Sequence, residues 1–196
     1  AKNFSWPYGF PSHSNPGAPG VILEGGELGY SLSTAWGAVL DNPDLISVCM
    51  IGDGEAETGP LATSWHLSKF INPKKDGAVL PIIHLNGYKI SGPSIFGRMK
   101  NEELAELFQG YGYEPVFVEG DDDKLYEDMP VALETCLQKI KKLQIEGKSA
   151  EDSFARFPMI ILRTKKGWTS IKESQGKKIE DNCLAHQVVC PDAKNN

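Results

Sequence analysis

The sequence has no apolar run of the roughly 20 residues that a membrane-spanning helix requires. It also has no excess of positive charge, because 20 Lys and Arg stand against 26 Asp and Glu, for a net charge of −6. Nucleic-acid binding relies on clustered basic residues that neutralise phosphates. The N-terminus shows no basic, apolar and small-residue signal of a secreted protein. We therefore expect no membrane or nucleic-acid partner and a cytoplasmic location.

Cysteine is also scarce, with four residues among 196. Cys49 lies in an apolar run and Cys136 in a helical pattern, which does not suggest the disulfide framework of a small secreted domain. Cys183, His186 and Cys190 are close enough in sequence to be weighed as zinc ligands. A structural zinc site needs a fourth ligand, and no other Cys or His stands nearby. We therefore expect reduced thiols rather than a zinc site.

Short apolar runs alternate with helical patterns along most of the chain. The apolar runs predict strands, and the patterns between them predict helices. The expected strands are 46–51, 79–85, 115–119 and 159–164, and the expected helices are 28–40, 60–70, 101–109 and 123–146. This alternation is typical of an α/β fold, a parallel sheet with helices on both faces.

The ends of the chain differ from its centre. We expect one partial domain, in which residues 1–26 form an ordered Pro- and Gly-rich loop, residues 27–164 the α/β core and residues 165–196 a segment that helps to build a site. Loops at the end of a sheet commonly carry function. The small residues of the helix 28–40 have two readings: close packing on the sheet, or a subunit interface beside a cofactor.

The segment Gly52-Asp53-Gly54-Glu55-Ala56-Glu57-Thr58-Gly59 joins the first expected strand to its helix. Ligands of open parallel sheets bind beyond the carboxyl ends of the strands. The segment does not fit a dinucleotide fingerprint, which would need Gly at Glu57. It does not fit a P-loop either, because Pro60-Leu61 stands where Lys and Ser or Thr are required.

The acidic side chains of this segment would repel a phosphate unless a cation stood between them. Magnesium prefers oxygen ligands and is often held by one or two protein groups together with substrate phosphates. Asn86 follows the next strand, and neighbouring strands lie about 4.8 Å apart, so Asp53 and Asn86 can converge on one ion. This is the Gly-Asp-Gly…Asn pattern of thiamine-diphosphate enzymes. The alternative reading is a turn with a glycine pair and a capping Asp.

Several further motifs make the chain similar to phosphoketolases over almost its entire length. They are Pro11-Ser12-His13, Glu24-Gly25-Gly26-Glu27-Leu28-Gly29-Tyr30, the Gly52–Pro60 segment, His84-Leu85-Asn86-Gly87-Tyr88-Lys89-Ile90, Gly110-Tyr111-Gly112-Tyr113, Lys166-Gly167-Trp168-Thr169 and Ala185-His186-Gln187. The resemblance implies a thiamine-diphosphate-binding fold of the diphosphate-binding (PP) type. It also implies a magnesium-dependent lyase that converts xylulose 5-phosphate, and in some members fructose 6-phosphate, with inorganic phosphate into acetyl phosphate and an aldose phosphate.

The resemblance also implies roles for individual residues. Asp53 and Asn86 would bind Mg²⁺ through side chains and Tyr88 through its carbonyl. Residues of the cofactor pocket would be Gly26, Glu27, Gly52, Gly54 and Glu55, of which Gly54 and Glu55 contact the diphosphate. His13, Lys166 and His186 would act on substrate protons and oxyanion charge. One departure is Leu23, which stands where the family commonly has His.

The resemblance further implies a pyrimidine-binding domain, from the same enzyme or a partner subunit of a homo-oligomer. We expect the 196-residue piece alone to be inactive. Two other readings stay open: a non-catalytic cofactor-binding or assembly protein, and a transketolase-like enzyme.

Overall fold

The computed structural model describes residues 9, 11, 13–120, 123–147 and 155–186. Its main sheet has four parallel strands in the order β1-β2-β4-β3. These strands are β1 (Ile46–Gly52), β2 (Ala78–Leu85), β3 (Tyr113–Glu119) and β4 (Phe157–Arg163). Each contains or overlaps one of the predicted apolar runs, so the predicted parallel α/β architecture is confirmed.

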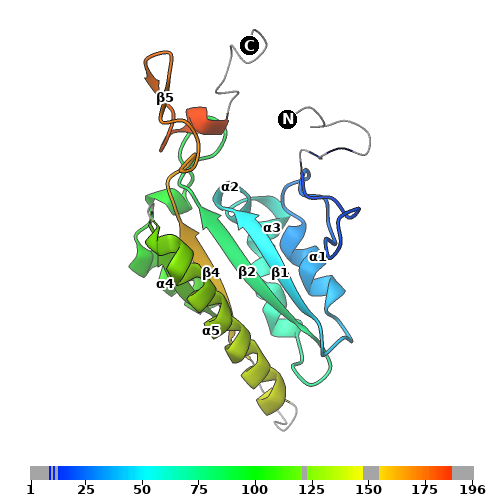
Figure 1. Ribbon diagram of the computed structural model, residues 1–196. Coiled ribbons are helices and arrows are strands. Elements are labelled where there is room, and N and C mark those ends of the chain that lie inside the picture. Colours follow the sequence, from blue (N-terminus) through cyan, green and yellow to red (C-terminus); the bar gives the residue numbers. More distant parts are fainter. Residues whose placement is uncertain (1–8, 10, 12, 121–122, 148–154, 187–196) are drawn as a thin grey trace.

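Helices lie on both faces of this sheet. Figure 1 shows α5 crossing the near side of the sheet while α3 lies behind it. The helical elements are α1 (Ser31–Ala38), α2 (Asp53–Ala56), α3 (Gly59–Ser64), η1 (Trp65–Phe70), η2 (Phe96–Arg98), α4 (Asn101–Tyr111) and α5 (Lys124–Gly147), where η marks a 3-10 helix. Within the described ranges, no helix is long and apolar enough to cross a membrane.

Aromatic side chains fill the core on the face opposite α5. The Trp65 ring packs edge-on against Phe108 of α4 and Tyr113 of β3, with ring centroids 5.0 and 5.7 Å apart. The Trp36 ring of α1 meets Phe157 of β4 in the same manner. Edge-to-face contacts add to the stabilisation that burial of these large rings supplies. The layer of α1, η1 and α4 is thereby fixed to the sheet.

The predicted helix 60–70 is not one continuous α-helix. It consists of α3 followed by the tighter turns of η1, which begin at Trp65. The hydroxyl groups of Thr63 and Ser64 donate to the carbonyl oxygen of Pro60 over 2.8 and 2.7 Å. Such side-chain bonds compete with the backbone pattern of an α-helix. The change of helix type follows from this competition and from the burial of the Trp65 indole, which donates to the Ala56 carbonyl.

The segment after β4 contains short elements of regular structure. It contains a short antiparallel hairpin, β5 (Glu173–Ser174) and β6 (Lys177–Lys178), and the 3-10 helix η3 (Cys183–His186). Gln175 and Gly176 both have positive φ, 51° and 72°. A two-residue hairpin turn with positive φ at both positions matches the twist of its strands. Gln-Gly was the sequence signal for this hairpin.

One side of β1 is not covered by the described residues. Cys49 and Ile51 are buried, whereas Val48 and Met50 on the opposite side of the strand are 53% and 56% exposed. Figure 1 shows that α5 lies over the other edge of the sheet and leaves the near side of β1 open. Within the described part of the chain, β1 pairs with β2 only.

Candidate metal- and diphosphate-binding site

The buried carboxylate of Asp53 connects the loops that follow β1 and β2. Its Oδ2 atom accepts hydrogen bonds from the Gly87 N–H and the Ser94 hydroxyl, both over 2.7 Å. Its Oδ1 atom accepts the Gly54 N–H over 2.9 Å. Asp53 is only 2% exposed, and buried charge is tolerated only when such donors compensate for lost hydration. The structure therefore brings Asp53 against the peptide that directly follows Asn86.

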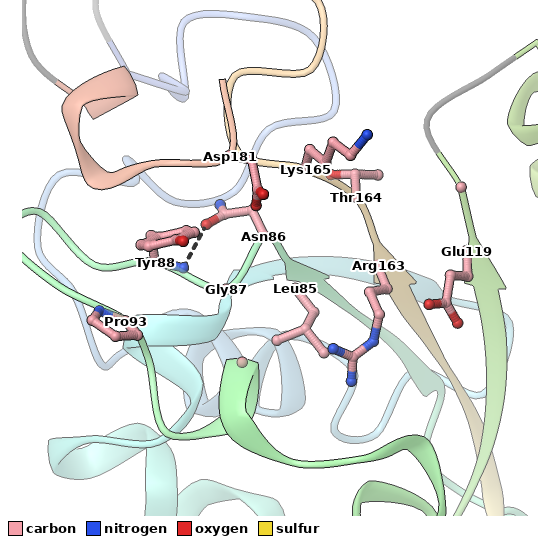
Figure 2. A pocket seen from close by; sticks show the side chains of 12 residues that line it. Leu85, Asn86, Gly87, Tyr88, Pro93, Glu119, Arg163, Thr164, Lys165 and Asp181 are labelled. Carbon is pink, nitrogen blue, oxygen red and sulfur yellow. Dashed lines mark hydrogen bonds between the residues drawn. The ribbon is translucent and has the colours of Figure 1, made fainter. Parts of the chain in front are cut away.

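The loop after β2, whose Gly87 N–H binds this carboxylate, also presents several oxygen atoms. The Asn86 amide oxygen accepts the Tyr88 N–H over 3.1 Å, and the bond is drawn in Figure 2. The carbonyl oxygens of Tyr88 and Lys89 both accept hydrogen bonds of 3.0 Å from the Lys166 ammonium. These carbonyl oxygens therefore already face a cation.

The carboxylate of Asp53, the side-chain amide of Asn86 and the carbonyl group of Tyr88 form what we call the metal corner. Their donor atoms fit Mg²⁺. A carboxylate, a side-chain amide oxygen and a backbone carbonyl are hard oxygen ligands, and Mg²⁺ completes its coordination with water and phosphate oxygens. Among the described residues there is no group of three or more His, Cys, Asp and Glu that could hold a metal. Asp53, Asn86 and Tyr88 contain a single acidic group, as a site completed by a diphosphate requires. Of the weighed zinc ligands, Cys190 lies outside the described residues.

The other two acidic side chains of the segment are bound by groups other than those that bind Asp53. Glu55 is buried, and its Oε1 accepts the Gly29 N–H over 2.9 Å and the Ser31 hydroxyl over 2.8 Å. These bonds tie α2 to the beginning of α1. Gly26 and Glu27 lie in the exposed turn that precedes Gly29. A contact of residue 55 with diphosphate stays a prediction, and its carboxylate has a structural role here.

Glu57 was not predicted from the sequence as a site residue. Its side chain is 2% exposed and forms an ion pair with Lys89. Its Oε2 accepts the N–H groups of Ile95 and Phe96 over 2.7 and 3.0 Å. An acidic residue in a Gly-rich loop gave no indication of these partners, because they lie nearly 40 positions away in the sequence.

The predicted catalytic residues come from the two ends of the chain. The Lys166 ammonium binds the Tyr88 carbonyl oxygen. Burial lowers the pKa of this ammonium, although Asp53 and Cys183 act in the opposite direction. His186 is exposed at the end of η3, and His13 is an exposed loop residue 3.4 Å from Glu24. Lys166 is thus joined directly to the metal corner. The Gly52 peptide ends β1 immediately before α2.

A cavity of about 480 Å³ opens beside Asn86. Figure 2 shows that its walls come from the ends of β2, β3 and β4 and from the C-terminal segment. Its lining includes Asn86, Tyr88, Glu119, Arg163, Lys165 and Asp181. A hollow of mixed charge beyond the carboxyl ends of parallel strands is the expected place for a polar ligand.

His84 stands at the end of β2 beside this corner, and the sequence left its role open. Its Nε2 atom is 3.0 Å from the Thr164 hydroxyl oxygen. Neighbouring protein groups remove part of the hydration of the imidazole and lower its pKa from 6.5, although the residue is exposed at the surface; the negative charge of Asp53 opposes that shift.

The fold defines the class of protein. A crystal structure of transketolase from Campylobacter jejuni subsp. jejuni superposes with a TM-score of 0.59 at 23% sequence identity, over 94% of this chain and 26% of that one. At this level of identity the likeness concerns the fold, a parallel α/β fold that the chain shares with that transketolase.

Sequence comparison identifies the family. The model described as the XFP N-terminal domain matches residues 1–196, and the chain belongs to this family. A probable phosphoketolase of Gloeobacter violaceus is 58% identical over 95% of this chain and 24% of its own length. One from Synechococcus elongatus is 57% identical over 100% of this chain and 25% of its own length. The resemblance seen in the motifs is thus confirmed, and the chain spans about a quarter of the length of these relatives.

Proposed function

We propose that this chain provides the metal- and diphosphate-binding part of a phosphoketolase. The enzyme would cleave xylulose 5-phosphate, with fructose 6-phosphate as a second candidate, and use inorganic phosphate to form acetyl phosphate and an aldose phosphate. The observation that carries the proposal is the 2.7 Å bond from the Gly87 N–H to Asp53 Oδ2. It unites the two halves of the Gly-Asp-Gly…Asn pattern in a chain whose family is phosphoketolase.

In this proposal Asp53 and Asn86 would hold Mg²⁺ through their side chains and Tyr88 through its carbonyl oxygen. Gly52 and Gly54 allow a diphosphate to come close to the backbone, and the turn with Gly26 and Glu27 forms another wall of the pocket. When bound, thiamine diphosphate supplies a carbon nucleophile for the ketose carbonyl, while Mg²⁺ neutralises its diphosphate. The acidic segment thereby tolerates an anionic cofactor.

The chain's own polar groups would manage protons and charge around the substrate. Lys166 donates two hydrogen bonds from a partly buried position, so it can stabilise negative charge on a substrate oxygen. His13 would exchange protons with substrate hydroxyl groups, and His186 would help to stabilise developing oxyanion charge and assist the loss of water. These roles are supported by their positions in the family's motifs.

A complete site would need a pyrimidine-binding domain, from the same polypeptide or from a partner subunit of a homo-oligomer. We infer that the isolated 196-residue chain does not turn over substrate. A cytoplasmic location fits Cys49 and Cys136, which are buried and unpaired. Formation of acetyl phosphate by the isolated chain would overturn the inference that this chain alone is inactive.

Two other functions would give different results in one assay. The natural full-length protein is incubated with Mg²⁺, thiamine diphosphate, phosphate and xylulose 5-phosphate, and acetyl phosphate is measured as its hydroxamate. A phosphoketolase forms acetyl phosphate only when phosphate is present. A transketolase-like enzyme would instead transfer a two-carbon unit to an added aldose phosphate, and a binding or assembly protein would do neither.

A further inference from the structure

The loop that follows β2 folds back over Asp53 and places a buried hydroxyl group on it. Ser94 is fully buried, at 0% exposure, and its Oγ lies 2.7 Å from Asp53 Oδ2. Ser94 is held in turn by its own N–H, which donates to the Gly87 carbonyl over 2.9 Å. Burial of a hydroxyl group costs free energy unless the group forms hydrogen bonds within the protein.

The direction of the Ser94 hydrogen bond is determined by its other partner. The Gly97 N–H can only donate, and it donates to Ser94 Oγ over 3.1 Å. The hydroxyl proton therefore remains for the Asp53 carboxylate, which accepts but cannot donate when ionised. Ser94 and the Gly87 N–H together occupy Oδ2, whereas Oδ1 accepts one bond from the described residues, that of Gly54. Oδ1 thus keeps free lone-pair capacity.

The loop is packed closely on itself in this arrangement. A Cβ atom on Gly97 would lie 2.6 Å from the Gly87 Cα, so the backbone at Gly97 packs directly on the backbone at Gly87. Glu57 fixes the far part of the loop through the Ile95 and Phe96 N–H groups and through Lys89. The carboxylate of Glu57 therefore holds Ser94 over Asp53.

We infer that Ser94 is a positioning residue that orients the Asp53 carboxylate, so that Oδ1 is the oxygen left to bind Mg²⁺. This inference rests on the proposed function and adds to it a residue that acts on the ion only through Asp53. Hydrogen-bond partners of a ligating carboxylate fix its orientation, and their loss typically weakens metal binding about 10- to 100-fold.

The test uses the natural full-length protein and the variant Ser94→Ala. Mg²⁺ is titrated calorimetrically in the presence of saturating thiamine diphosphate, and activity is measured over the same range of Mg²⁺. We expect Ser94→Ala to weaken Mg²⁺ binding about 10- to 100-fold, with kcat restored at saturating Mg²⁺. A residue that served only the stability of the loop would lower the melting temperature without this selective effect on Mg²⁺.

Ser91→Ala is the matched control, because Ser91 is an exposed serine in the same loop. It should leave Mg²⁺ affinity unchanged. If Ser94→Ala does not fold, Ser94→Cys is titrated instead, because its thiol is a weaker donor and should give a smaller loss. Unchanged Mg²⁺ affinity in the folded variant would overturn the inference alone. A wild-type protein that binds neither Mg²⁺ nor thiamine diphosphate would overturn the proposed function and this inference with it.

Discussion

Lys166 donates a 3.0 Å hydrogen bond from its ammonium to the carbonyl oxygen of Tyr88, the atom proposed as the backbone ligand of Mg²⁺. The C-terminal segment and the metal loop are therefore joined by a charged group. The same ammonium binds the Lys89 carbonyl oxygen. Lys166 is thus fixed at the corner where substrate, cofactor and metal are proposed to meet.

Replacement of this lysine should affect catalysis far more than folding. In the full-length protein, Lys166→Met should lower kcat about 10²- to 10³-fold, the usual cost of removing one donor that stabilises developing negative charge. Lys177→Met is the matched control, because Lys177 is an exposed lysine of the same C-terminal segment, and it should change kcat little. Steady-state assays of acetyl phosphate formation measure both. Equal losses in the two variants would contradict the assigned role of Lys166.

Removal of the Glu55 carboxylate should destabilise the fold. In Glu55→Ala the buried Gly29 N–H loses its partner, and an unsatisfied buried donor costs about 1–3 kcal/mol. At about 2–4 °C per kcal/mol for a chain of this size, the melting temperature should fall by several degrees. Thermal unfolding followed by circular dichroism measures the change. Glu102→Ala, at an exposed position of α4, should leave the melting temperature nearly unchanged.

The His84 imidazole should titrate below its ordinary pKa of 6.5. The unfolded chain then binds the proton more readily than the folded chain. The free energy of unfolding should therefore decrease as the pH falls below 6.5. The NMR shifts of the ring protons, assigned with His84→Asn, report the pKa directly. Asp53→Asn should lower the pKa further, because Asp53 raises it. An unshifted His84 in the wild-type protein would contradict the prediction.

The thiols of Cys49 and Cys136 should be unreactive in the folded protein. Burial raises the pKa of Cys49 to about 12 and that of Cys136 to about 11, and only the thiolate reacts with alkylating reagents. Iodoacetamide at pH 8, followed by peptide mass spectrometry, should label neither residue unless denaturant is added. Cys183, which is partly exposed, provides the internal comparison. Rapid native labelling of Cys49 would refute its burial.

The sequence predicted the sheet because each strand is a short apolar run of a buried parallel sheet. The sequence also predicted that Asp53 and Asn86 lie close together, since parallel strands place their carboxyl ends at one edge of the sheet. The structure brings Asp53 against the peptide that follows Asn86. The resemblance to phosphoketolase depended on motifs spread along the chain, and the family comparison confirmed it.

The roles of Glu57 and Ser94 could not be predicted in this way. Their partners depend on how a loop of irregular backbone folds back between two strands, and no periodicity describes such a path. The break between α3 and η1 has a similar cause, because it depends on the burial of Trp65. In these cases tertiary contacts decide the local structure over intrinsic preference.

The open side of β1 has a consequence for handling this chain on its own. Val48 and Met50 are more than half exposed on a strand whose outer backbone groups have no partner within the described residues. An exposed apolar edge strand is a template for pairing with another copy of the same chain. The isolated 196-residue polypeptide should therefore self-associate with rising concentration, and a lysine at position 48 should keep it dispersed.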